Sequence, residues 1–169
     1  MLSRGQAQPR SRESLVLSDP AYVTRLLTSV GLRPTRQRIA LSRLLFGVER
    51  QHLTAEMLFA AAAQAKIGMS LATVYNTLNQ LAEMGLLRRI GVDGTKTYFD
   101  TNVSEHSHFY FEHSHELVDI ADPLVAARTL DVPAGYEVSR IDVVVRVKRK
   151  AVGGCSRSTV LVSAQNVFD

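Results

Sequence analysis

The stretch HSHFYFEHSHE, residues 106–116, places four of the five histidines of this 169-residue chain within ten positions. His106 and His108 are two residues apart, so on an extended segment both side chains point to the same face. Imidazole nitrogens placed in this way can bind one first-row metal ion or the iron of a porphyrin. The spacing therefore predicts a metal or haem site at His106 and His108. His113 and His115 are interpreted as solvent-facing or hydrogen-bonded structural residues.

The residues before this cluster have the pattern of helices followed by a hairpin. Asp19-Pro20 predicts a helix start, with Asp as N-cap and Pro at the first helical position. RPTRQRIALSRLLF predicts a second helix, and Thr54 and Ser70 are expected to cap a third and a fourth, the last ending at Gly85. LLRRIGVDGTKTYFD then predicts two strands joined by a tight turn at Asp93-Gly94. This order of elements is typical of a winged helix.

The fourth helix has an apolar face and a polar face. Its polar side is expected to carry side chains that can address base edges in the major groove of DNA, namely Thr73, Tyr75 near the edge, Asn76, Thr77 and Gln80. The opposite face consists of Leu71, Val74, Leu78 and Leu81, at helical spacing. An ordinary amphipathic surface helix has the same pattern, so periodicity alone leaves both interpretations open.

Basic residues are concentrated in the first half of the chain. Residues 1–100 contain 13 Lys and Arg against 7 Asp and Glu, whereas residues 101–169 contain 7 against 9. A polyanion partner for the first half would explain this asymmetry. Phosphate contacts are expected from Arg33, Arg36, Arg38 and Lys96.

The pattern as a whole predicts an α+β chain. An N-terminal winged helix-turn-helix domain over residues 19–100 is expected to precede a small α/β domain over 101–150. The second domain is expected to contain a short helix near 122–130 and a strand within YEVSRIDVVVRVKRK, residues 136–150. Residues 1–18 are interpreted as an N-terminal arm and residues 151–169 as a tail of unknown role. Since the N-terminus lacks the apolar core of a signal peptide and no apolar run is long enough to span a bilayer, we expect a cytoplasmic protein.

Four blocks of the sequence carry a family resemblance: GLRPTRQRIAL, HLTAEMLF, SLATVYNTLNQLAEMGLLRR and DGTKTYFD. Together they resemble successive blocks of the ferric uptake regulator family, over about residues 20–150. SLATVYNTLNQL, GTKTYFDTN and HELVDI are most similar to its iron response regulator branch. The resemblance implies a homodimeric bacterial transcription regulator, with a winged helix-turn-helix DNA-binding domain over residues 19–100 and a small α/β dimerisation and metal- or haem-sensing domain over 101–150. It also implies that Tyr75 lies on the recognition helix and that Arg33 approaches the DNA. Asn76 stands where many relatives carry a longer basic residue, so its base readout is expected to differ.

The resemblance also implies an inter-domain metal site, with ligands His52, Asp100, His106, His108 and Asp119. Three imidazoles and two carboxylates suit Fe(II), Mn(II) or Zn. The family's Cys-x-x-Cys zinc motif is replaced by Phe111 and Ser114, so a four-thiolate structural zinc is excluded. The three-histidine run of the iron response branch is interrupted by Ser107, and its Cys-Pro haem motif is absent because Ser156 follows Cys155.

These observations predict a regulator, rather than an enzyme, that controls iron and haem metabolism genes through an AT-rich double-stranded DNA operator. Its effector is expected to be a divalent metal, haem, or both. A metal- or haem-sensing or storage module without DNA contact is an alternative. A His-ligated metalloenzyme is a weaker one, because a catalytic metal needs an open coordination position and a nearby base, and no His-Glu-x-x-His signature is present.

Overall fold

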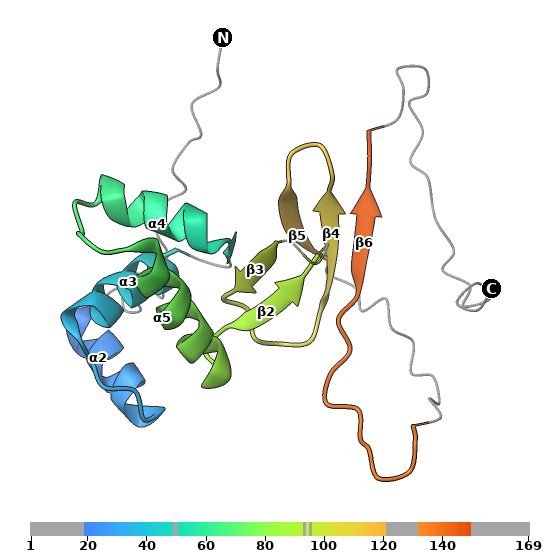
Figure 1. Cartoon of the computed structure of the whole chain (residues 1–169), viewed down its shortest axis with the longest axis horizontal. Helices are drawn as coiled ribbons and strands as arrows, with labels where there is room; N and C mark the ends of the chain where they lie inside the picture. The colour runs from blue at the N-terminus through green and yellow to red at the C-terminus, as the bar shows by residue number, and fades with distance from the viewer. Residues whose placement is uncertain (1–18, 49–50, 93, 95, 121–131, 150–169) are drawn as a thin grey trace. The chain divides into compact units, whose positions relative to one another are not determined.

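A computed structural model describes residues 19–48, 51–92, 94, 96–120 and 132–149. The described part of the chain divides into two compact units after Val103, and Figure 1 labels most of the helices and strands of each. The expected N-terminal arm, the expected short helix near 122–130 and the tail at 151–169 lie outside the described residues. None of the helices in the described part has the length and apolar character to cross a bilayer.

The first unit contains the four predicted helices, α2 (Pro20–Ser29), α3 (Arg36–Phe46), α4 (Ala55–Gln64) and α5 (Leu71–Glu83). Each begins after an N-cap side chain that accepts from the free backbone N–H groups of the first turn, and these caps are Asp19, Thr35, Thr54 and Ser70. Helix α3 is shorter than expected, because Thr35 caps it and Arg33 therefore precedes it. Gly85 follows α5 with a φ of +73°, which non-glycine residues rarely adopt.

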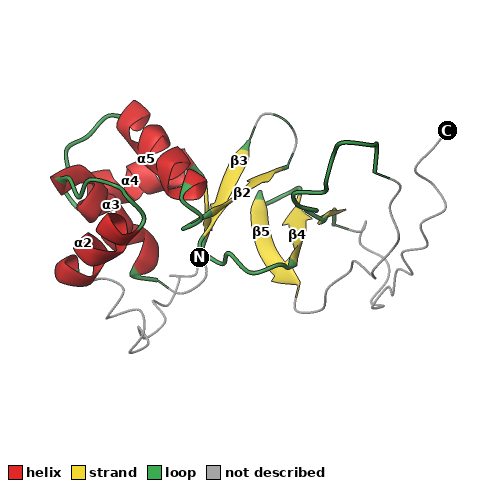
Figure 2. Cartoon of the chain, turned by 90° about the horizontal axis from the view of Figure 1, so that it is seen from below, coloured by secondary structure: helices red, strands yellow, loops and turns green. Residues whose placement is uncertain are grey.

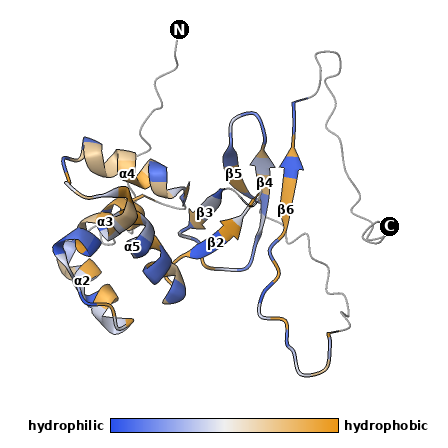
Figure 3. Cartoon of the chain, in the orientation of Figure 1, coloured by the Kyte–Doolittle hydropathy of each residue, from blue (hydrophilic) through white to orange (hydrophobic). Residues whose placement is uncertain are grey.

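The core of this unit is formed by the apolar stripes of the helices. Buried members come from every helix, among them Val23, Leu27, Leu41, Leu45, Leu58, Val74, Leu78 and Leu81. The expectation that Thr77 lies on the outward polar face of α5 is wrong, since Thr77 is buried. Thr77 follows Val74 by three residues and precedes Leu81 by four, which places it on the apolar stripe. In Figure 3, α4 is coloured as hydrophobic along most of its length, consistent with its alanine-rich sequence.

A three-stranded sheet completes the first unit. The predicted hairpin is present as β2 (Arg88–Gly91) and β3 (Thr97–Asp100), paired antiparallel. A two-residue strand, β1 (His52–Leu53), pairs with the other edge of β3, so the order is β1-β3-β2. Strand β1 was not expected, because two residues are too short to show a period-2 pattern. Its register places His52 directly opposite Asp100.

The second unit has its own three-stranded sheet, visible in yellow in Figure 2. Strands β4 (Ser107–Phe111) and β5 (Glu116–Ile120) form an antiparallel hairpin, and β6 (Val144–Val147) pairs parallel with β4, giving the order β5-β4-β6. The strand expected within 136–150 is thus confined to the four residues that pair with β4. His108 lies opposite Asp119 in the β4–β5 register.

Candidate metal centre and nucleic-acid face

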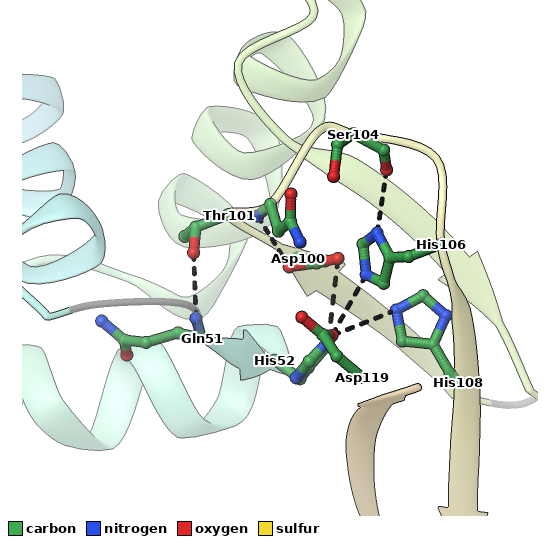
Figure 4. Close-up of polar contacts among 9 residues, drawn as sticks. Gln51, His52, Asp100, Thr101, Ser104, His106, His108 and Asp119 are labelled. Atoms are coloured by element: carbon green, nitrogen blue, oxygen red, sulfur yellow. Dashed lines mark hydrogen bonds and ion pairs between the residues drawn. The ribbon is translucent and has the colours of Figure 1, made fainter. Parts of the chain in front are cut away.

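Two of the predicted metal ligands, His52 and Asp100, come together in the first unit. The β1–β3 register places His52 Nε2 3.6 Å from Asp100 Oδ2, and the Asp100 carboxylate is buried. The other carboxylate oxygen, Oδ1, accepts from the Asn102 backbone N–H at 2.7 Å. Gln51 and Thr101 hold the ends of the two strands together, because the Gln51 N–H donates to Thr101 Oγ1 and the Thr101 N–H donates to the Gln51 carbonyl. These contacts orient the pair (Figure 4).

The remaining three predicted ligands, His106, His108 and Asp119, come together in the second unit. Asp119 Oδ1 lies 3.1 Å from His106 Nε2 and 3.7 Å from His108 Nε2, and the two imidazole centroids are 4.4 Å apart. The three ligand atoms lie within 4.8 Å of one another. Strand pairing explains this geometry, since His108 lies opposite Asp119 and His106 is two residues before His108 on the same face. Figure 4 shows the three side chains converging.

The tautomer of His106 follows from its second contact. His106 Nδ1 lies 2.8 Å from the backbone carbonyl of Ser104, which can only accept a hydrogen bond. Nδ1 therefore carries the proton, and in the neutral ring Nε2 carries the lone pair. A lone pair 3.1 Å from a carboxylate oxygen is favourable only with positive charge between or on the two groups. A metal ion satisfies this condition. In metal-bound histidines, the ring nitrogen that does not bind the metal typically donates to a backbone carbonyl or a carboxylate, as Nδ1 of His106 does to Ser104.

The side chains in each unit are of the kinds that bind a divalent first-row metal. Imidazole nitrogens and carboxylate oxygens together suit Zn, Fe(II) and Mn(II). The first unit supplies two such ligands and the second supplies three. A zinc site usually has four ligands, and octahedral sites for Mn need more. Neither set alone fills a coordination shell from its own protein side chains.

His115, in the β4–β5 turn, has a structural role. His115 adopts a φ of +55°, and its Nδ1 lies 2.7 Å from the Tyr110 hydroxyl. Arg146 on β6 lies over the Tyr110 ring at 5.4 Å from its centroid. Hydrogen bonding and cation–π contact thus tie the turn to the sheet at the position where the resemblance implied a cysteine motif.

Three of the predicted base-reading residues, Thr73, Tyr75 and Asn76, lie on the first half of α5, whereas the Gln80 side chain accepts hydrogen bonds from Arg38. Tyr75 and Asn76 are exposed, whereas Thr73 is half-buried and its hydroxyl lies 2.9 Å from that of the N-cap Ser70. The Tyr75 hydroxyl donates to Glu56 Oε1 on α4 at 2.5 Å. The Tyr75 hydrogen bond is the main reason why the pKa of Glu56 is below its usual value, and the same bond raises the pKa of Tyr75. Glu56 was not singled out from the sequence, because nothing in a linear pattern pairs it with Tyr75.

The predicted phosphate-binding residues differ in their surroundings. Arg33, Arg36 and Lys96 are exposed. Arg38 is half-buried, and its Nε and Nη2 both donate to Gln80 Oε1, at 3.1 and 2.7 Å, while Nη1 donates to the Arg33 carbonyl. Arg38 therefore links α3 to α5. Arg36 and Lys66 line a hollow of about 410 Å³, and Lys66 was also missed by sequence reasoning.

Both the sequence and the fold of this chain are similar to those of known proteins. The sequence matches the ferric uptake regulator family over residues 29–147. It is 34% identical over 112 residues to the ferric uptake regulation protein of Haemophilus ducreyi, covering 64% of this chain and 75% of that protein. The fold is similar to the ferric uptake regulator of Vibrio cholerae (TM-score 0.60, 23% identity, 75% of this chain and 98% of that one). It is also similar to that of Pseudomonas aeruginosa with manganese (TM-score 0.58, 24% identity, 76% and 98%).

The family match covers more than half of the chain and includes both units, from the end of α2 to the end of β6. The N-terminal helices and the two sheets confirm the predicted α+β fold. The chain therefore belongs to the ferric uptake regulator family, and it is a metal-responsive transcriptional regulator rather than an enzyme.

Proposed function

We propose that this chain regulates iron and haem metabolism genes as a homodimer, with the affinity for an AT-rich operator set by one divalent metal ion per protomer. The proposed metal ligands are His52, Asp100, His106, His108 and Asp119. Within the family, the iron response regulator branch is the assignment that the SLATVYNTLNQL, GTKTYFDTN and HELVDI segments support. Proteins of the family bind DNA as dimers.

The division of five ligands between two units is the observation that carries this proposal. His52 and Asp100 are neighbours in the first unit, and the other three are neighbours in the second. Because neither set completes a coordination shell by itself, a metal ion gains most by binding both sets at once. Such an ion would favour one relative orientation of the two units over others and would thereby change the population that is competent to bind DNA.

The first unit supports DNA contact. Tyr75 and Asn76 are exposed on α5, and Thr73 is accessible beside them. Tyrosine, asparagine and threonine side chains can contact the donors, acceptors and thymine methyl groups of the major groove. Arg33, Arg36 and Lys96 supply exposed positive charge for the phosphates, and Arg38 holds α3 against α5. Haem or metal storage without DNA contact would not require this combination.

Metal binding is tested by titrating Mn²⁺ or Zn²⁺ into the purified, chelator-treated protein. The shared site predicts that His52→Ala and His108→Ala each weaken binding by at least about tenfold. Because both ligands serve the same ion, the double variant is expected to lose less than the product of the two single effects. Independent multiplicative losses, or a His52→Ala variant that binds like the wild type, would show that the two units do not share a metal.

DNA binding is tested by selecting duplexes from a randomised library with the metal-loaded and the metal-free protein. An AT-rich inverted repeat is expected, bound at least about a thousandfold more tightly than a scrambled duplex. Arg33→Ala is expected to weaken binding to both duplexes. It is also expected to reduce the slope of log affinity against log salt concentration by about one. If no sequence is enriched and the affinity does not depend on the base sequence of the duplex, this proposal is wrong. The chain would then be a sensing or storage module without specific DNA contact.

Haem is the second candidate effector, because a hollow of about 270 Å³ adjoins His106 in the second unit. Its lining combines apolar Val138, Ile141 and Val143 with Glu105 and with Arg140, whose guanidinium is ion-paired with Asp142 at 2.6 Å. Apolar side chains suit a macrocycle. Addition of haemin is expected to give a Soret band that shifts in His106→Ala. An identical spectrum in the two proteins would remove His106 as an axial ligand.

A further inference from the structure

The hydrogen bond between Tyr75 and Glu56 joins two helices of the first unit at the proposed DNA-reading surface. Tyr75 is in the second turn of α5, and the residue is 37% exposed. Glu56 is the second residue of α4, which packs against α5. The phenol hydroxyl donates to the nearer carboxylate oxygen at 2.5 Å, the short distance expected for an O–H···O⁻ bond.

Glu56 is held in place independently of Tyr75. It lies in the first turn of α4, directly after the N-cap Thr54 and Ala55. After the Tyr75 bond, hydrogen bonds to the Thr54 side chain and to its own backbone are the next causes that lower the pKa of Glu56. Lys96, which directly precedes β3 of the β2–β3 hairpin, adds a smaller favourable charge interaction with the Glu56 carboxylate. The carboxylate is therefore ionised at neutral pH and fixed by the helix start.

A fixed acceptor changes what an exposed tyrosine can do. An unrestrained tyrosine on a helix surface samples more than one rotamer, and ordering it on binding costs free energy. A phenol already held in one rotamer avoids much of that cost. A carboxylate beside it also repels phosphates, which disfavours sequence-independent association more than base-specific contact.

We propose that Glu56 is a positioning and specificity-determining residue: its carboxylate fixes the Tyr75 phenol in one orientation on α5, and its negative charge lowers affinity for non-cognate DNA. The inference rests on the proposed function, because it requires α5 to contact DNA. Glu56 itself acts through Tyr75 and need not touch a base. Two substitutions separate its two effects, since Glu56→Asp keeps the charge but loses the reach, and Glu56→Gln keeps the reach but loses the charge.

The first experiment requires no DNA. The Tyr75 phenol is titrated by ultraviolet difference spectroscopy in the full-length protein, with Tyr75→Phe subtracted to isolate it from the other tyrosines. In the wild type its pKa is expected above 10.0. Both Glu56 variants are expected to lower it towards that value, whereas Glu83→Gln, which removes a carboxylate at the exposed end of α5, is expected to leave it unchanged. Coincident titrations of the wild type and both Glu56 variants would overturn the positioning role.

The second experiment measures binding to the selected duplex and to a scrambled duplex of the same composition. Glu56→Asp is expected to reduce the preference for the selected duplex about threefold to tenfold, the effect of one exposed hydrogen bond, without changing affinity for the scrambled one. Glu56→Gln is expected to raise affinity for the scrambled duplex. Unchanged preference in both variants would overturn the inference while leaving the regulator function intact. A wild type without any preference would instead overturn the function, and the titration would still decide whether Glu56 holds Tyr75.

Discussion

Removal of one imidazole from the second unit provides a quantitative test of metal binding by this protein. His108 is 1% exposed, lies on β4 and faces Asp119 across the sheet. Since metal binds the native state and not the unfolded one, it raises the unfolding free energy by RT ln(1 + [M]/Kd). At a free metal concentration of one hundred times Kd, this increase is about 2.7 kcal/mol.

The expected change in melting temperature follows from the size of the chain. For 169 residues, each kcal/mol shifts the midpoint by about 2–4 °C, so saturation of the wild type predicts a rise of about 5–11 °C. If His108→Ala weakens binding about a hundredfold, the stabilisation at the same metal concentration falls to about 0.4 kcal/mol. The corresponding shift is about 1–2 °C.

Differential scanning fluorimetry with and without Mn²⁺ or Zn²⁺ measures both shifts. Because each variant is compared with its own metal-free form, the packing cost of the substitution cancels. His113→Ala is the matched control, since His113 is exposed on the β4–β5 turn and does not belong to the ligand cluster. It is expected to keep the full shift. Equal shifts in the wild type and His108→Ala would refute ligation by His108.

Three further predictions concern the first unit. Leu78→Ala, at a fully buried position of α5, is expected to lower the unfolding free energy by about 3–5 kcal/mol in urea denaturation, whereas the exposed Met57→Ala is expected to change it by less than about 0.5 kcal/mol. Gly85→Ala is expected to cost about 1–2 kcal/mol because φ is +73°, while Gly68→Ala, which has open space and no positive φ, is expected to be nearly neutral; parallel denaturation curves compare them. The pKa of Glu56 is depressed below 4.5, so its contribution to stability is present above that pH and is lost as pH falls through the lower folded value. The pKa of Tyr75 is raised above 10.0, so the same bond weakens only when pH rises through that raised value. The stability difference between the wild type and Glu56→Gln is therefore expected to persist from about pH 5 to pH 10 and to vanish in acid; a constant difference down to about pH 2 would contradict this.

Sequence patterns over neighbouring residues were sufficient to predict the helices α2 to α5 and the β2–β3 hairpin. Asp19, Thr54 and Ser70 were correctly predicted as N-caps, because a short polar side chain before an apolar-periodic segment satisfies the free N–H groups of a helix start. The Asp93-Gly94 dipeptide likewise predicted the β2–β3 hairpin, although Asp93 itself lies outside the described residues. These features depend on residues a few positions apart, which a sequence displays directly.

Features that depend on pairing between distant residues were harder to predict. Strand β1 exists because His52 and Leu53 pair with β3, nearly fifty residues later, and two residues carry no periodicity of their own. The Tyr75–Glu56 and Arg38–Gln80 bonds likewise join residues on different helices. The prediction that Thr77 faces outward was wrong. Threonine is a polar residue type, but this position lies on the apolar stripe of α5, where the side chain is buried.

The candidate metal ligands were predictable in part from nearby residues and in part only through the family resemblance. His106 and His108 were predicted as ligands from their spacing alone, and in the structure both imidazoles lie beside the Asp119 carboxylate. His52, Asp100 and Asp119 were proposed only through the family resemblance, since they are scattered over the chain. The Ser104 carbonyl that sets the His106 tautomer could not have been predicted, because it depends on the path of the backbone before β4.

The central claim is that metal bound by His52, Asp100, His106, His108 and Asp119 controls operator binding. Its most direct test is the affinity of the full-length protein for the selected duplex, measured at controlled free Mn²⁺ and again with chelator. In the wild type, the two affinities are expected to differ by at least about tenfold, and in Asp119→Asn the difference is expected to disappear. Equal wild-type affinities in both conditions, or a full metal response in Asp119→Asn, would contradict the claim.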